Sequence, residues 1–568
     1  MKNVLYTLLL IVTFLSNQKS IAQTESFEWA KQITGEDYNS ISNLRIDNNG
    51  NSIITGSFKG INDFDPGTGI NNLVSDSFEN IYLGKYAPDG ALMWVKHFSS
   101  NADSYSSSLD LDSEGNILLG GNYRGTIDLD PGVDTEEFTA ISNYHSDAFI
   151  CKLDSLGNYI WAFSQHTSIN SLTIDESNNL YSIGSFAGTI DFDPDTTELL
   201  VYGDFSSSNT YISKHNPDGQ IIWTKQYFST NSANVGFEIA IDQSNNVITS
   251  GYIKGQTDFD PTLLNQYNLN TNGEEDIYFC KLDSNGTLLW AKSIGGLANE
   301  RPNYIITDPF NNIYFTGYYH DSIDVDPGAG IQNMNNLGDR NGFLLKLDSL
   351  GNYTWSIPYQ GLEFTTPIGI AIDPLGNLYI TGLFAGSTDF DPNAGSTILN
   401  STNRSAFIQK ITDQGELIWV KKIPSENGDV YGLNICVDDS FEVYTSGIFT
   451  GYTDFGIGTP NQILDGGNIH DIYIHKISQN ISTVGISEFN KGVQYSISPN
   501  PATNFTYLFL GDQEDRQITL LDSSGKPIEQ FRLDQQSLIL DLSKYTPGIY
   551  LIHVEDKYGA EVLKLVVE

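Results

Sequence analysis

The sequence predicts an all-β protein in which one structural unit occurs seven times. Short runs of β-branched and aromatic residues alternate with turns rich in Asn, Asp and Gly, a pattern typical of strands. The 568 residues include 52 glycines, and 39% of them are hydrophobic, which favours many short strands around a large core. All the tryptophans occupy one position of a repeat, 62 to 67 residues apart: Trp29, Trp94, Trp161, Trp223, Trp290, Trp355 and Trp419.

Each unit is predicted to hold four strands. In the copy between Trp161 and Trp223, "INSLTIDESNNLYSIGSF" gives two strands joined by a tight turn, and "AGTIDFDPD" leads into a variable loop. The copy closes with "TYISKHNPDGQIIW", a hairpin whose turn holds Asp218 and Gly219. A period of this length is typical of stacked units that cannot bury their apolar faces alone.

The two ends of the array predict a closed ring. The last copy stops at "DIYIHKISQN", before its tryptophan strand, whereas the first copy begins with a spare strand, "FEWAKQI", around Trp29. Pairing of these ends would remove the exposed strand edges. We therefore expect residues 23–478 to form a seven-bladed β-propeller with four strands per blade, its last blade closed by the N-terminal strand.

The repeats resemble the secreted bacterial β-propeller (SBBP-type) repeat family over about residues 27–478. The strings "G-x-F-x-G…DFDPG" and "LDSxGNxxW" carry the resemblance. It implies the propeller fold and indicates little about function.

The N-terminus predicts a signal peptide at residues 1–22. A lysine precedes the apolar run Val4–Leu15, and Ser20 and Ala22 place small residues at the −3 and −1 positions of a cleavage site before Gln23. The apolar run of about 12 residues is too short for a membrane span. We therefore expect no transmembrane segment in the mature chain.

The C-terminal residues predict a second domain. Residues 479–490 are typical of a linker, and residues 491–568 alternate as the strands of a small β-sandwich. This tail resembles the type A C-terminal sorting domain of the type IX secretion system of Bacteroidetes; an ordinary accessory sandwich is the alternative. The resemblance implies the type IX machinery as a partner and a secreted or outer-membrane surface-attached protein. Its matching residues are Pro499, Asn500, Pro501, Gly548, Tyr550 and Lys564.

The net charge restricts the classes of binding partner, and the cysteine content restricts disulfide bonding. The net charge of −41, from 70 acidic and 29 basic residues, repels phosphate backbones, so we expect no nucleic-acid partner. Three cysteines in an exported chain exclude a complete disulfide framework. Cys151 and Cys280 occupy equivalent positions of non-adjacent copies, so we expect both to be small buried hydrophobic residues.

The sequence shows no catalytic or cofactor motif. It contains no His-Glu-x-x-His, P-loop, dinucleotide fingerprint or G-x-S-x-G elbow. The hairpin "LDSLGNYIW" has the Gly-to-Trp spacing of quinoprotein dehydrogenase repeats, but without a cofactor-holding group this similarity is confined to blade packing. We therefore predict no catalytic residue and no organic cofactor.

The repeated "DFDP" stretch is the remaining candidate site. Positions i and i+2 of a strand face the same way, so its two carboxylates stand together and predict Ca²⁺ binding if a loop or water completes the shell. A turn with backbone N–H donors is the interpretation that the recurrence of the stretch favours, and acid–base catalysis is a third. The candidate ligands are Asp63, Asp65, Asp128, Asp130, Asp191, Asp193, Asp258, Asp260, Asp324, Asp326, Asp389 and Asp391.

These observations favour an exported, non-enzymatic propeller that binds a ligand, glycan or partner protein, and we expect it to be monomeric. The alternative is an enzyme that acts on an extracellular polymer from the propeller funnel, with catalytic groups on unlike loops. A structural adhesin is a third hypothesis.

Overall fold

The computed structural model describes most of the chain. It covers residues 22–482 except 143–145, 194–198, 204–206, 230–231, 263–264, 392–394 and 458–461, and residues 496–567 except 499–501, 503–504, 511–515, 522–525, 534–536, 547 and 557–558. The predicted signal peptide up to residue 21, most of the predicted linker, and Pro499, Asn500 and Pro501 lie outside the described residues, as does the side chain of Lys564.

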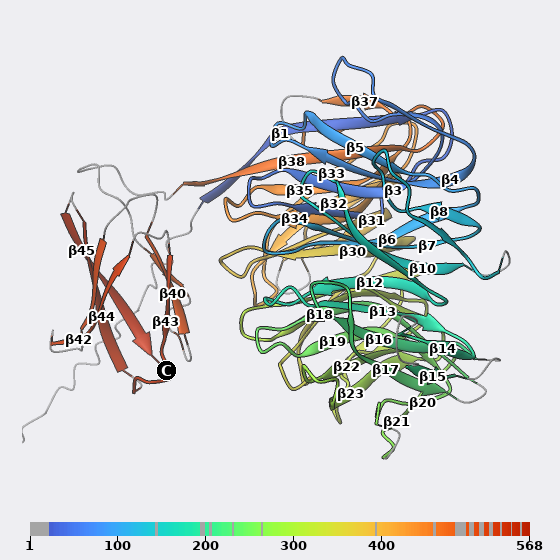
Figure 1. Cartoon of the computed structure of the whole chain (residues 1–568). Coiled ribbons are helices and arrows are strands. Elements are labelled where there is room, and N and C mark those ends of the chain that lie inside the picture. Colours follow the sequence, from blue (N-terminus) through green and yellow to red (C-terminus); the bar gives the residue numbers. More distant parts are fainter. Residues whose placement is uncertain are drawn as a thin grey trace, which may run out of the picture. The chain divides into compact units, whose positions relative to one another are not determined.

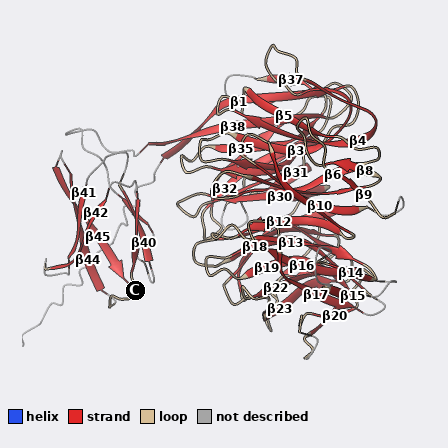
Figure 2. Cartoon of the chain, viewed as in Figure 1, coloured by secondary structure: helices blue, strands red, loops and turns tan. Residues whose placement is uncertain are grey.

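Every regular element in the described residues is a β-strand (Figure 2). The chain divides into two compact units, Gln23–Ile481 and a C-terminal unit that begins at Ser482. No helix long and apolar enough to cross a membrane occurs among the described residues. The predicted all-β fold is therefore confirmed.

The larger unit is built from a four-stranded antiparallel group. In one copy, β12 (Ser168–Ile174), β13 (Leu180–Phe186), β16 (Asn209–His215) and β17 (Ile221–Ser229) pair in chain order. The "DFDP" stretch begins at the end of a short strand, here β14 (Thr189–Asp191). These are the four strands that the sequence predicts for a unit.

The same antiparallel order recurs along the chain (Figure 1). Further groups are β2 (Asn43–Ile46), β3 (Ser52–Asp63), β4 (Asn72–Tyr86), β5 (Leu92–Phe98); β6 (Ser104–Leu111), β7 (Ile117–Tyr123), β10 (Asp147–Leu153), β11 (Tyr159–Gln165); β18 (Ala233–Ile241), β19 (Val247–Lys254), β22 (Asp276–Leu282), β23 (Leu288–Gly296); β24 (Glu300–Thr307), β25 (Ile313–Tyr319), β28 (Arg340–Leu347), β29 (Tyr353–Tyr359); and β30 (Phe364–Ile372), β31 (Leu378–Asp389), β32 (Ile398–Ile411), β33 (Leu417–Ile423).

The last group takes its fourth strand from the N-terminus. β34 (Val430–Val437), β35 (Val443–Phe449) and β38 (Asp471–Ser482) pair in order, and β1 (Ala22–Gly35) pairs with β38. Figure 1 shows the blue β1 beside the orange β38. Pairing of the two ends of the array, as the spare strand around Trp29 predicts, is thus observed.

The first strands of the groups contact one another in a closed cycle. β2 contacts β6, and the series continues through β12, β18, β24, β30 and β34, which in turn contacts β2. These innermost strands therefore surround a common centre. Residues of every group meet at this centre.

A tryptophan hydrogen bond joins neighbouring groups at five of the junctions. The Trp29 indole Nε1 donates to the Pro88 carbonyl at 3.0 Å, and this bond joins the last group to the first. The indole nitrogens of Trp94 and Trp419 have no hydrogen-bond partner among the described residues. Equivalent bonds run from Trp161 to Pro217, Trp223 to Ser284, Trp290 to Ser349 and Trp355 to Asp413.

A buried lysine supports the same junctions. Lys281 Nζ lies 2.7 Å from Asp242 Oδ2 of its own group and 3.1 Å from the Ser349 carbonyl of the next. Asp242 also accepts the backbone N–H groups of Ser244 and Asn246, so both buried charges are satisfied. The same ion pair recurs as Lys85–Asp47, Lys152–Asp112, Lys214–Asp175 and Lys410–Asp373.

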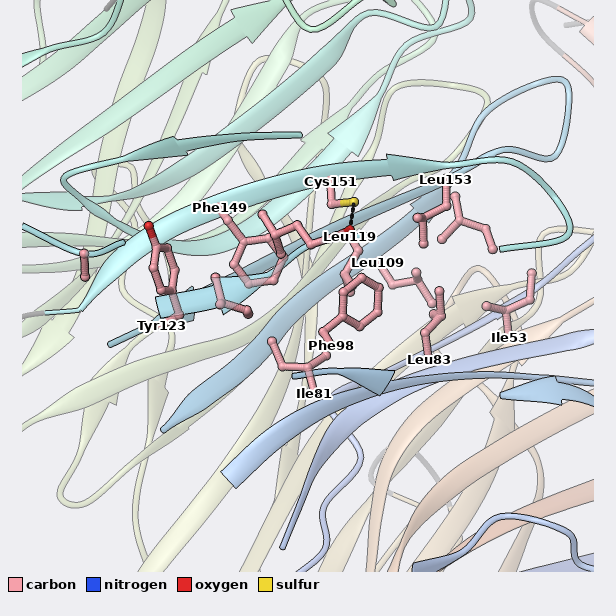
Figure 3. Packing of buried hydrophobic residues seen from close by; sticks show 14 residues of the cluster. Ile53, Ile81, Leu83, Phe98, Leu109, Leu119, Tyr123, Phe149, Cys151 and Leu153 are labelled. Carbon is pink, nitrogen blue, oxygen red and sulfur yellow. Dashed lines mark hydrogen bonds between the residues drawn. The ribbon is translucent and has the colours of Figure 1, made fainter. Parts of the chain in front are cut away.

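Apolar side chains fill the space between neighbouring groups. Figure 3 shows one such cluster, in which Leu83 and Phe98 of one group pack with Leu109 and Phe149 of the next. Cys151 belongs to this cluster, and its thiol lies 3.5 Å from the Leu129 carbonyl. Cys151 and Cys280 are both fully buried and unbridged, as predicted.

The C-terminal unit consists of two antiparallel sheets with one apolar core. The first holds β39 (Ser496–Ser498), β40 (Phe505–Phe509) and β43 (Ser537–Asp541). The second holds β42 (Pro527–Leu533), β41 (Arg516–Leu521), β44 (Gly548–Asp556) and β45 (Gly559–Val567). Leu508, Leu540, Ile518 and Ile552 of the two sheets share the core, which is the arrangement of a β-sandwich.

The Lys281–Asp242 pair provides a test of the junctions. Replacing Lys281 with Met should lower the free energy of unfolding of the repeat unit by about 3 kcal/mol, because it leaves the Asp242 carboxylate buried without its cation. Chemical denaturation of the full chain measures the change. Lys59→Met is the control, since Lys59 and Asp37 are exposed and 3.9 Å apart. Equal effects of the two variants would contradict this role of the buried pair.

Candidate functional site

The first aspartate of each "DFDP" stretch binds backbone N–H groups. Asp128 Oδ1 accepts the N–H of Asp130 at 3.1 Å and that of Glu136 at 2.9 Å. The second donor lies beyond the Asp-Pro turn, so the carboxylate ties together the two sides of the loop. The same pair of bonds is made by Asp63, Asp191, Asp258, Asp324, Asp389 and Asp454.

The second aspartate shapes the turn that follows it. Asp65 Oδ1 accepts the N–H of Gly67 at 2.8 Å, and Asp130 and Asp326 bind the glycine two residues on in the same way. The N–H groups in these bonds are the backbone donors that a turn at the "DFDP" stretch predicts. Among the described residues, no group of three or more His, Cys, Asp or Glu is placed to hold a metal ion. Calcium binding at the twelve aspartates stays a prediction.

A cavity of about 400 Å³ lies where the innermost strands meet. Every innermost strand contributes to its wall, so it belongs to the ring as a whole. Its lining differs chemically from strand to strand. One residue from each of β2, β6, β12, β18, β24, β30 and β34, in that order, is Arg45, Asp110, Thr173, Glu238, Tyr304, Ala371 and Cys436.

The cavity residues have a defined place in the repeat. Each innermost strand is followed by a turn aspartate such as Asp47 or Asp112, and the residue two positions before that aspartate lines the cavity. Side chains alternate along a strand, so this position and the one two residues earlier point to the same face. The position has no constant identity: it is Arg45, Asp110, Thr173, Ala240, Ile306, Ala371 and Cys436.

Sequence reasoning missed these residues because it followed the positions that recur. Packing and turns demand similar residues in every copy, whereas a binding centre on the axis of a ring needs unlike residues from different copies. The available signal was variation at one repeat position beside a constant turn aspartate. The cavity groups described here also come from strands, not from the loops that the enzyme hypothesis invokes.

An ion pair lies in the cavity wall. Arg45 Nε is 3.3 Å from Asp110 Oδ1, and Thr173 Oγ1 donates to Asp110 Oδ2 at 3.1 Å. Arg45 Nη1 also donates to Asn43 Oδ1 at 2.6 Å. The side chains of Arg45 and Asp110 are 24% and 20% exposed, so both remain accessible from the cavity. Opposite charges from adjacent strands are thus held in fixed positions.

Glu238 is a second carboxyl group with a different environment. Its Oε2 accepts a hydrogen bond from Ser171 Oγ at 3.0 Å. Burial raises the pKa of Glu238 to about 8, outweighing the opposite effects of Ser171 and Arg45. The side chain is partly exposed to the cavity. At neutral pH this carboxyl group mostly keeps its proton and can donate a hydrogen bond.

Cys436 and Tyr304 complete the polar lining. The Cys436 thiol lies 3.2 Å from the Leu44 carbonyl, and burial raises its pKa to about 11. The nucleophilic thiolate is therefore scarce at neutral pH. Burial likewise raises the pKa of Tyr304, so its hydroxyl stays protonated. Both groups act as hydrogen-bonding and packing surfaces at neutral pH.

Glu238 gives the protein a pH-dependent stability that can be measured. Its folded-state pKa lies above the ordinary 4.5, so its contribution is complete below about pH 4.5 and is lost as the pH rises through about 8. The melting temperature of Glu238→Gln relative to wild type should therefore increase between pH 5 and pH 9. Exposed Glu114→Gln is the matched control. A pH-independent difference for Glu238→Gln would refute the protonated state.

The calcium prediction is tested by melting the chelator-treated protein with and without added Ca²⁺. A ligand that binds only the folded state at a hundred times its Kd stabilises it by about 2.7 kcal/mol, so the melting temperature should rise. Mg²⁺ at the same concentration controls for ionic strength. An unchanged melting temperature would remove calcium from the aspartate pairs.

Comparison with known proteins yields one curated relative of unknown role. An uncharacterized WD repeat-containing protein, L264, of Acanthamoeba polyphaga mimivirus is 26% identical to this chain. The match covers 77% of this chain and 37% of the viral protein, so the chain spans little more than a third of the length of that relative.

Solved structures share only weak similarity with the chain. Quinohemoprotein alcohol dehydrogenase ADHIIG from Pseudomonas putida HK5 has 12% identity and a TM-score of 0.35, over 84% of this chain and 79% of that one. BamB from Moraxella catarrhalis has 12% identity and a TM-score of 0.34, over 80% and 98%. PorZ, a surface component of the type-IX secretion system of Porphyromonas gingivalis, has 12% identity and a TM-score of 0.24, over 93% and 81%. Values this low do not establish a shared fold or function.

A family model matches the C-terminal unit. Residues 496–568 match the secretion system C-terminal sorting domain. Of the predicted sorting residues, Gly548 begins β44, the Tyr550 hydroxyl donates to the Thr546 carbonyl at 2.8 Å, and Lys564 lies in β45 opposite Leu551. The chain therefore carries a type IX sorting domain at its C-terminus, which directs it to secretion, with attachment to the cell surface or release.

Proposed function

We propose that residues 23–478 form a seven-bladed β-propeller that binds an extracellular ligand in its central cavity. The observation that carries the proposal is the cavity itself, whose wall combines unlike residues from every innermost strand. The closed cycle of contacts and the pairing of β1 with β38 support the closed ring. The four antiparallel strands of each group support the blades.

Export brings this propeller to its ligand. The sorting domain at residues 496–568 makes the type IX secretion machinery a partner. We propose further that residues 1–22 are a signal peptide cleaved before Gln23, that residues 479–490 link the propeller to the sorting domain, and that the chain is an SBBP-type repeat protein from Bacteroidetes. The expected mature product is a monomer outside the cell.

The arrangement of the polar groups favours binding over catalysis. Asp110 is held by Arg45 and Thr173, which keeps donors and acceptors in place before a ligand arrives. Such preorganisation reduces the entropy lost on binding. A cavity of about 400 Å³ lies within the size range of small-ligand sites.

One observation keeps an enzyme as the second candidate. Asp110 lies beside the Arg45 cation, whereas burial raises the pKa of Glu238 to about 8, and two carboxyl groups in such different environments can serve as base and acid. Hydrolysis of an extracellular polymer is the reaction class that such a pair would support. Product formation separates this function from binding.

Binding by the secreted protein tests the proposal. We expect saturable binding on an array of extracellular glycans and proteins, without product, and about tenfold or greater loss of affinity for Asp110→Asn. Lys59→Gln, on the exposed surface, is the control. Circular dichroism verifies that the variants fold, and Thr173→Val removes the hydroxyl partner of Asp110 with little change in shape. Turnover would favour the enzyme instead, and unchanged affinity in both cavity variants would place the ligand elsewhere.

A further inference from the structure

At one position of the innermost strands, the cavity wall is polar on one side and apolar on the other. At the position two residues before the turn aspartate, three successive strands carry Arg45, Asp110 and Thr173. The next three strands carry an alanine, Ile306 and a second alanine at that position. At this position a ligand meets hydrogen-bonding groups on β2, β6 and β12 and hydrocarbon on β18, β24 and β30. Two residues earlier, Glu238 on β18 and Tyr304 on β24 add a carboxyl and a hydroxyl group to the second side.

The small residues of the apolar side make room for a ligand. Ala240 on β18 and Ala371 on β30 occupy the position that Arg45 fills on β2. A long side chain at either alanine would occupy part of the 400 Å³. The cavity volume is thus a property of these copies of the repeat, not of the repeat in general.

The charges of the wall nearly cancel. Arg45 and Asp110 neutralise each other at 3.3 Å, and Glu238 is bound by the hydroxyl of Ser171 and mostly protonated at neutral pH. An anionic ligand would also approach against a net charge of −41. A cationic ligand would find Asp110 already paired. The wall therefore suits an uncharged ligand.

We infer that the central cavity binds a neutral sugar residue. The inference rests on the proposed binding function and names its ligand class. Sugar hydroxyls both donate and accept hydrogen bonds, which suits Asp110 as acceptor and Arg45 and protonated Glu238 as donors. The C–H face of a pyranose ring packs on apolar and aromatic surface, such as that of Ala240, Ala371 and Tyr304. The sugar is either a free monosaccharide or the end of an extracellular glycan.

Calorimetric titration of the full secreted chain tests this inference. The probes are methyl glycosides of neutral hexoses, neutral oligosaccharides, the corresponding uronic acids, and short peptides. We expect neutral sugars to bind wild type, and Ala371→Leu to lose at least about tenfold in affinity because leucine fills the cavity. Ala91→Leu, at an exposed hairpin position, is the matched control and should bind as wild type does.

Each outcome has a defined meaning. Binding of monosaccharides identifies a free sugar as a sufficient ligand, whereas binding of oligosaccharides alone identifies a glycan end. Binding of uronic acids or peptides that is lost in Ala371→Leu, with neutral sugars inert, overturns the ligand class and keeps the proposed function. Neutral-sugar binding that Ala371→Leu leaves unchanged overturns the cavity as the sugar site. If no probe binds in a way that depends on Ala371, both the inference and the proposed function fail for these ligands.

If Ala371→Leu does not fold, Thr173→Val takes its place. This variant removes the hydroxyl that holds Asp110, at nearly constant volume. Neutral-sugar affinity should then fall while the melting temperature stays close to that of wild type. Full affinity in this variant would contradict a role for the polar side of the cavity.

Discussion

The junction between neighbouring groups is the interaction on which the rest of the structure depends. An indole nitrogen of one group donates to a hairpin carbonyl of the next, and a buried lysine joins an aspartate of its own group to the same neighbouring turn. The Trp29–Pro88 bond repeats this contact between the last group and the first. The bond recurs at five tryptophans, and the innermost strands of successive groups contact one another until the series returns to its starting point. Without that regularity there would be no common centre for their side chains.

Regular junctions leave the inward positions free to differ. The turn aspartates, such as Asp242, fix the ends of the innermost strands through backbone bonds and the lysine pair. The side chain two residues before Asp242, that of Ala240, takes part in neither the backbone bonds nor the lysine pair. Copies can place arginine, aspartate or alanine there without changing the ring. The same architecture that makes the copies alike on the outside therefore permits an asymmetric, chemically specific centre.

The sequence predicted the architecture well because packing repeats. The tryptophan period and the spare strand around Trp29 were sufficient for the strand order and for the pairing of the two ends. Backbone donors for the aspartates were foreseen as an alternative, but the second donor lies across a loop of variable sequence, so Asp128 could not be paired with Glu136 in advance. The cavity groups could not be identified from the sequence because Arg45, Asp110 and Glu238 belong to no motif. Their proximity follows from the packing of the innermost strands around one centre, which brings together residues far apart in the sequence.

The N-terminal strand β1 pairs with β38 near the other end of the larger unit, so the contacts at this seam join residues that are very far apart in the sequence. Gln32 Nε2 donates to the Asp465 carbonyl, 433 residues away along the chain, and to Asp471 Oδ2. Most other pairings join strands of one group, which form locally, whereas this one must wait for the whole array. The loop-closure entropy of the array is concentrated in the β1–β38 pairing. That seam is therefore the pairing with the largest sequence separation in the ring and the one with the greatest loop-closure cost.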